Sequence, residues 1–178
     1  MARIAPIDID QAPARARALL DEYADRAGDP GPMIRTMAKA PAVLRGYLDL
    51  NRAMKRSHLD RRVTERIALA AQEWIGCDYC VAAHTAAAQK LGLSDRDIAL
   101  ARQGTATDPA IASIVAFGQQ VIAAPAEITD ADLERLRTHG YTDERIAEVV
   151  GIVSLMLLTG AFNLVAGIEP PNTARSAA

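Results

Sequence analysis

The chain has 178 residues, of which half are hydrophobic and only 4% are aromatic. This length fits a single domain, and a composition rich in alanine and leucine favours helices with small side chains at their contacts. The 20 basic and 22 acidic side chains nearly balance, and no basic patch with interleaved aromatics is present, which argues against nucleic-acid binding. Residues 1–11 lack a positive segment followed by an apolar run, so we expect a cytoplasmic protein.

Helical periodicity and capping residues predict helices throughout and no strand. In chain order they cover about residues 9–26, 33–38, 41–55, 61–75 and 78–91, then a helix capped by Ser94, one over 108–123, one capped by Thr129, and one from Thr142 to about Ile168. In the helix over 61–75, a buried stripe is expected at Val63, Ile67, Ala70 and Trp74. We therefore expect an all-α, single-domain helical bundle over residues 1–169, followed by a flexible tail over 170–178.

Residues 149–168 are uncharged and about long enough to cross a bilayer. The segment contains Ser154, Thr159, Asn163 and three glycines, and a charged turn precedes it. A helix that is apolar all round is also what a protein core or the centre of an oligomer requires. We therefore expect a buried helix and no membrane association.

The most informative stretch is residues 65–84, ERIALAAQEWIGCDYCVAAH, which holds both cysteines and one of the three histidines. Cys77, Cys80 and His84 are spaced i, i+3, i+7, which puts all three on one face of a helix that begins near Cys77. A helix N-terminus stabilises a thiolate, and a nearby histidine can take the thiol proton. A disulfide across two intervening residues is exchangeable, so this spacing favours a dithiol redox pair.

Other interpretations of the two cysteines fit less well. Haem attachment requires histidine directly after the second cysteine, where Val81 stands, and a thioredoxin fold requires strands around the motif. Structural zinc usually has four ligands, and the remaining histidines, His58 and His139, lie in segments expected to be exposed turns. A three-ligand zinc site and a pair of inert buried cysteines stay open as alternatives.

The pattern Glu65, eleven intervening residues, then Cys77-x-x-Cys80-x-x-x-His84 resembles the signature of the alkylhydroperoxidase D-like branch of the carboxymuconolactone decarboxylase superfamily. The closing AFNLVAGIEPP is similar to that branch as well. The resemblance implies that Cys80 attacks a hydroperoxide, that Cys77 resolves the sulfenic acid into a disulfide, that His84 is the general base, and that Glu65 orients His84. Glu73 is the second carboxylate that could fill the last role.

The resemblance further implies a trimer or hexamer, a dithiol or redox-protein electron donor, and no metal or cofactor. The sequence departs from the pattern of the best-known family member at Tyr79, where that member has histidine. A phenol is a far weaker base near neutral pH, so a pocket-lining role and a catalytic role for Tyr79 stay open as equal alternatives. We thus expect a thiol-dependent peroxidase. The alternatives are a redox-sensing or disulfide-exchange protein without turnover, and a carboxymuconolactone decarboxylase-like enzyme.

Overall fold

The computed structural model describes residues 2–169, and all regular structure in this range is helical. The α-helices are α1 (Ala14–Ala27), α2 (Pro32–Met37), α3 (Pro41–Met54), α4 (Arg61–Ile75), α5 (Asp78–Lys90), α6 (Asp95–Arg102), α7 (Pro109–Ala123), α8 (Asp130–Thr138) and α9 (Asp143–Ala166). Two 3₁₀ turns, η1 (Ile9–Gln11) and η2 (Pro125–Glu127), complete the described chain. The prediction of an all-α fold is confirmed, and the expected tail over 170–178 lies outside the described residues.

Most predicted helix boundaries agree with the structure to within one or two residues, but the first helix differs. The predicted helix over about 9–26 is divided into η1 and α1 by extended backbone at Ala12 and Pro13. The residue before a proline is driven towards extended conformations, and this explains the break. The 3₁₀ turn η2 was not predicted. Ser94 and Thr129 cap α6 and α8 as predicted, each in a capping box with an aspartate, Asp97 and Asp132.

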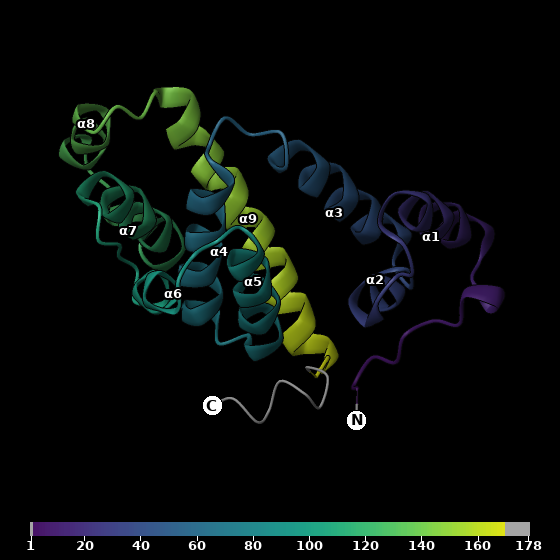
Figure 1. Ribbon diagram of the computed structural model, residues 1–178. Coiled ribbons are helices and arrows are strands. Elements are labelled where there is room, and N and C mark those ends of the chain that lie inside the picture. The colour runs from purple at the N-terminus through teal and green to yellow at the C-terminus, as the bar shows by residue number, and fades with distance from the viewer. Residues whose placement is uncertain (1, 170–178) are drawn as a thin grey trace.

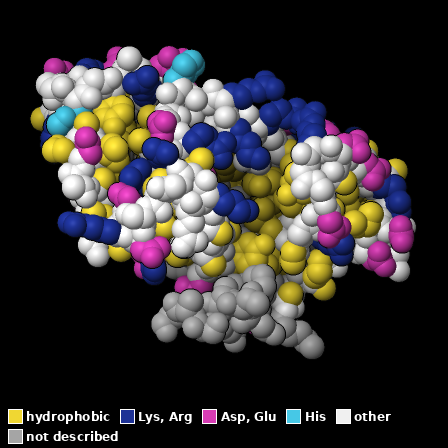
Figure 2. Space-filling view, viewed as in Figure 1, with side chains coloured by type: hydrophobic (Ala, Val, Ile, Leu, Met, Phe, Trp, Pro, Cys, Tyr) yellow, Lys and Arg dark blue, Asp and Glu magenta, His cyan; other side chains and the backbone are white. Residues whose placement is uncertain are grey.

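The helices form two groups in space (Figure 1). In the larger group, α4 contacts α5, α6, α7 and α9, and it is therefore the central helix. A smaller group, α1 to α3, lies to one side and joins the larger group through contacts between α3 and α9. Each group has its own buried cluster, centred on residues such as Ile67, Ile114 and Val149 in the larger group and Leu20 and Leu44 in the smaller. Hydrophobic side chains also gather in a hollow between the two groups, with basic side chains along its upper rim (Figure 2).

Helix α9 has the length and composition of a membrane span, and it is the one such helix among the described residues. Half of its most apolar window is buried inside the protein, where it packs on α3, α4 and α7. Polar Thr159 and Asn163 lie on this buried side. These contacts are those of a core helix. Four apolar side chains of α9 remain exposed: Val150, Leu157, Leu164 and Val165. Assembly into a trimer or hexamer stays a prediction.

The predicted buried stripe on α4 ends earlier than expected. Val63, Ile67 and Ala70 are buried, but Trp74 is 50% exposed, so its assignment to the core was wrong. The helical period does place Trp74 on the same face as Val63. In the last turn of α4, however, the described helices leave this face uncovered, and periodicity alone does not reveal where a covering helix ends.

The beginning of the described chain contacts the end of α9. The backbone N–H of Arg3 donates to the carbonyl oxygen of Ala166 (2.8 Å), and its guanidinium donates to the carbonyl of Leu164 (2.7 Å). The last carbonyl groups of a helix have no partners within the helix, so Arg3 satisfies groups that would otherwise need water. This contact brings the first residues next to the site described below.

Candidate active site

The two cysteines lie at the junction between α4 and α5. Gly76 ends α4 in the left-handed conformation (φ 79°), which glycine adopts without a steric penalty. Cys77 then occupies the N-cap of α5, and Cys80 lies in its first turn. The two residues form a disulfide with a Cα–Cα distance of 5.3 Å, within the usual range for bridged cysteines. The predicted pair is therefore brought together at a helix start, and both residues are buried.

The helix N-terminus acts on the two sulfur atoms unequally. The Sγ of Cys77 accepts the backbone N–H of Cys80 at 3.3 Å, as an N-cap side chain does. The Sγ of Cys80 accepts no backbone N–H among the described residues, because Cys80 is already inside the first turn. The sequence argument that the helix start stabilises a thiolate thus applies in the structure to Cys77.

Glu65 and His84 meet across the interface between α4 and α5. The Nδ1 of His84 lies 2.7 Å from Oε2 of Glu65, whose side chain is almost fully buried. Arg61 lies 3.7 Å from the other carboxylate oxygen. This arrangement fixes the imidazole ring and leaves Nε2 as the nitrogen that can exchange a proton. Glu73, the alternative carboxylate, instead pairs with Arg102 at 2.8 Å on the surface.

In this disulfide form, no hydrogen bond joins His84 to either sulfur among the described residues. Cys80 and His84 are four residues apart on α5 and therefore share a face. The structure thus unites Glu65 with His84 and Cys77 with Cys80. A proton can therefore pass between the two pairs only in the reduced form or through an intervening water.

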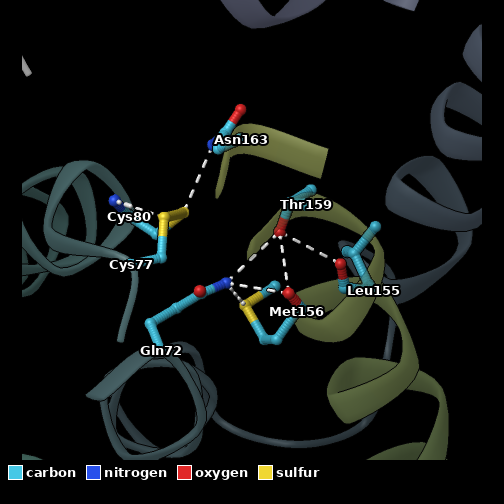
Figure 3. The surroundings of a disulfide bond; sticks show 7 residues. All are labelled: Gln72, Cys77, Cys80, Leu155, Met156, Thr159 and Asn163. Carbon is cyan, nitrogen blue, oxygen red and sulfur yellow. Dashed lines mark hydrogen bonds between the residues drawn. A yellow bond between two sulfur atoms is a disulfide. The ribbon is translucent and has the colours of Figure 1, made fainter. Parts of the chain in front are cut away.

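Two buried amides next to the disulfide were not identified as site residues from the sequence (Figure 3). The Nδ2 of Asn163 donates to Sγ of Cys80 at 3.3 Å. The Nε2 of Gln72 donates to the carbonyl of Met156 and to the hydroxyl of Thr159, which links α4 to α9. For Asn163 the sequence signal was a polar residue within an apolar helix, and it argued only against a membrane span; no sequence signal singled out Gln72.

Helices α4 and α9 approach closely beside these amides because residue 160 is glycine. A Cβ atom at Gly160 would lie 2.6 Å from Oε1 of Gln72 and 2.9 Å from a methyl carbon of Ile75. Real Cβ contacts are not that short, so a larger residue would push the two helices apart. The glycine therefore helps to keep α9, and with it Asn163, near the cysteines.

Two cavities border the site. One of about 140 Å³ lies beside Glu65 and His84, and its lining combines apolar side chains of α3, α4 and α9 with Lys55 and Arg61. A second, of about 270 Å³, is lined by Cys77, Tyr79, Asn163 and Arg3 among others. Cys77 is thus the cysteine next to a cavity on the outer side, and Tyr79 has the position of a lining residue there. Nearby, burial raises the pKa of Tyr47 to about 12, so its phenol stays protonated at neutral pH.

Comparisons with known proteins agree with this arrangement. Residues 41–123, which contain the two cysteines, Glu65 and His84, match the model of the Carboxymuconolactone decarboxylase family. A search of curated protein sequences found no match.

Solved structures share the fold over nearly the whole chain. An alkylhydroperoxidase AhpD core protein from Ralstonia eutropha, described as peroxidase-related, is 25% identical with a TM-score of 0.84, covering 97% of this chain and 94% of that one. A peroxidase-related protein from a Silicibacter species is 20% identical with a TM-score of 0.79, and the match covers 97% and 94% of the two chains. The debrominase Bmp8 is 18% identical with a TM-score of 0.79 over 98% and 95%, which shows the fold alone. The family match over residues 41–123, the fold shared with the alkylhydroperoxidase AhpD core protein and the Glu-Cys-Cys-His pattern support the alkylhydroperoxidase D-like branch of the carboxymuconolactone decarboxylase superfamily.

Proposed function

We propose that the protein is a thiol-dependent peroxidase that reduces organic hydroperoxides through a Cys77–Cys80 dithiol–disulfide cycle. The observation that carries the proposal is the bonded cysteine pair at the start of α5, on the same helix face as His84, which pairs with the buried Glu65. A metal or flavin is not needed for this chemistry, because the two thiols supply both electrons.

The cycle has three steps. The Cys80 thiolate attacks the distal oxygen of ROOH, the O–O bond breaks, and a sulfenic acid forms at Cys80 while RO⁻ takes a proton and leaves as ROH. The Cys77 thiol then attacks the sulfenic sulfur, and water leaves as the disulfide forms. A dithiol donor finally returns two electrons and two protons, and it becomes a disulfide itself. In this scheme His84 accepts the Cys80 proton, and Glu65 stabilises the resulting imidazolium.

The cavity beside His84 suggests that the substrate is organic rather than hydrogen peroxide alone. Its lining includes the apolar side chains of Met54, Ile152, Leu155 and Met156. Apolar surface favours an alkyl group over water. The outer cavity next to Cys77 suggests where the dithiol donor attacks, since attack at Cys77 makes Cys80 the leaving group.

The decisive experiment measures consumption of tert-butyl hydroperoxide and hydrogen peroxide with a series of dithiol donors. The wild type should turn over many times, while Cys80→Ser should lose the activity and Cys77→Ser should react once and stop. A redox sensor would oxidise once even with excess donor. A decarboxylase-like enzyme would act on a lactone equally well in the Cys80→Ser variant. Either of these results would replace the peroxidase proposal.

A further inference from the structure

The side chain of Asn163 contacts one of the two reacting atoms of the site. Its Nδ2 lies 3.3 Å from Sγ of Cys80, although the two residues are 83 positions apart in the sequence. We propose that Asn163 is a further catalytic residue, whose amide N–H stabilises the thiolate form of Cys80. This inference rests on the proposed function, because the proposed function assigns Cys80 as the reacting thiol.

The two sulfur atoms need different donors because of their places on α5. Cys77 is the N-cap, and its sulfur receives the backbone N–H of Cys80. Cys80 is within the first turn, so the unpaired N–H groups of the helix start do not reach its sulfur. Among the described residues, the side-chain amide of Asn163 donates the hydrogen bond that Sγ of Cys80 accepts. Anionic acceptors form stronger hydrogen bonds than neutral ones, so the contact favours the thiolate over the thiol.

The position of Asn163 is fixed by contacts on both sides. One turn earlier on α9, Thr159 accepts a hydrogen bond from Gln72 of α4. Just after Asn163, the helix ends at Gly167, and the backbone carbonyl of Asn163 accepts the N–H of Ile168 at 2.9 Å. Asn163 itself is 2% exposed. In the disulfide form its amide is therefore held towards the sulfur by the packing of α9.

The other end of the same amide is unsatisfied. The Oδ1 of Asn163 is buried and has no hydrogen-bond partner among the described residues. A leucine has a similar volume and would fill this position without burying an unpaired polar atom, which is unfavourable. Packing therefore does not account for asparagine here, whereas its contact with Cys80 does (Figure 3).

The hydrogen bond would act in two steps of the cycle. In the first, it raises the fraction of Cys80 that is present as the nucleophilic thiolate. In the last, a donor thiolate attacks Sγ of Cys77, the Cys77–Cys80 bond breaks, and its electron pair leaves on Sγ of Cys80. A sulfur of lower pKa leaves faster, so the same amide accelerates reduction of the disulfide.

The test is a titration of the Cys80 thiolate by its ultraviolet absorbance in a Cys77→Ser background, which leaves one cysteine. Asn163→Leu removes the donor at nearly constant volume, and Asn163→Asp replaces it with an acceptor of the same shape. The matched control is Gln72→Leu, because Gln72 is also a buried amide between α4 and α9 but its side chain donates to Met156 and Thr159 and to neither cysteine sulfur. Melting temperatures show whether each variant is folded.

We expect both Asn163 variants to raise the apparent pKa of Cys80 by about one, which lowers the thiolate population at pH 7 by up to about tenfold. The aspartate variant should show the larger change, and Gln72→Leu, which removes only an indirect support of Asn163, should shift the titration less than Asn163→Leu. If folded Asn163→Leu or Asn163→Asp titrates like its parent, or if Gln72→Leu shifts the curve equally, the inference is wrong. The titration uses no peroxide, so a protein without peroxidase turnover that still shows these shifts would refute only the proposed function.

Discussion

Replacing Glu65 with glutamine tests the link between the acid, the base and the thiols. The substitution keeps the shape of the side chain and its position 2.7 Å from Nδ1 of His84, but it removes the charge. A hydrogen bond to a charged group contributes about 1.5–3 kcal/mol and a neutral one about 1 kcal/mol. The difference of roughly 0.5–2 kcal/mol should be lost when His84 becomes cationic during proton transfer, which corresponds to an approximately 2- to 30-fold lower kcat/KM for the hydroperoxide.

The assay is the initial rate of tert-butyl hydroperoxide reduction at several substrate concentrations with saturating dithiothreitol. Glu73→Gln is the matched control, since Glu73 is on the same helix but pairs with Arg102 at the surface. Exposed ion pairs contribute little, so this variant should stay within about twofold of the wild type. Greater damage in Glu73→Gln than in Glu65→Gln would show that the wrong carboxylate was assigned. Equal activity in all three proteins would show that the Glu65–His84 contact is structural.

Four further outcomes are expected. Mild peroxide treatment should give an intramolecular Cys77–Cys80 disulfide in peptide mass mapping, and intermolecular dimers alone would contradict the resolving role of Cys77. His84→Ala should slow oxidation of Cys80 by roughly 10²-fold in stopped-flow assays, the usual scale for loss of a positioned base; an unchanged rate would remove the base from the scheme. Gly160→Ala should lower the free energy of unfolding in urea by about 1–3 kcal/mol, because its Cβ would overlap Gln72 and Ile75; a neutral result would mean that α9 shifts freely. Hydrogen bonds from the Ser94 side chain and backbone, and from Arg66, lower the pKa of Asp97, so its contribution to stability is present at neutral pH and is lost as the pH falls through that lowered value. Asp97→Asn should therefore cost about 1 kcal/mol at pH 7 and progressively less below pH ~4 in denaturation curves, and a pH-independent loss would exclude the ionised form as the cause.

The sequence predicted those features of the fold that depend on neighbouring residues. The caps at Ser94 and Thr129 are local signals, and the helix boundaries next to them agree with the structure. The prediction failed where the outcome depended on distant segments. Whether Trp74 is covered is decided by where other helices end, and this cannot be read from the periodicity of α4.

The same distinction applies to the site. Cys77, Cys80 and His84 are close in the sequence, so helical spacing was enough to place them on one face. Glu65 was assigned through the resemblance to a family, and the structure confirms its contact with His84 but does not test the role of either residue. Asn163 reaches Cys80 from 83 residues away. Only the packing of α9 against α4 and α5 brings them together, and no local pattern encodes that contact.

The contact of Arg3 with the end of α9 has a practical consequence for work with this protein. Arg3 binds the carbonyl oxygens of Leu164 and Ala166 and lines the cavity next to Cys77. Residues joined ahead of Arg3, such as those of an affinity tag, would lie near this wall and enter the space through which we propose that the dithiol donor reaches Cys77. Preparations tagged at opposite ends should therefore be compared before any donor is ranked by rate. A donor that appears inactive with one preparation could simply have been kept away from Cys77.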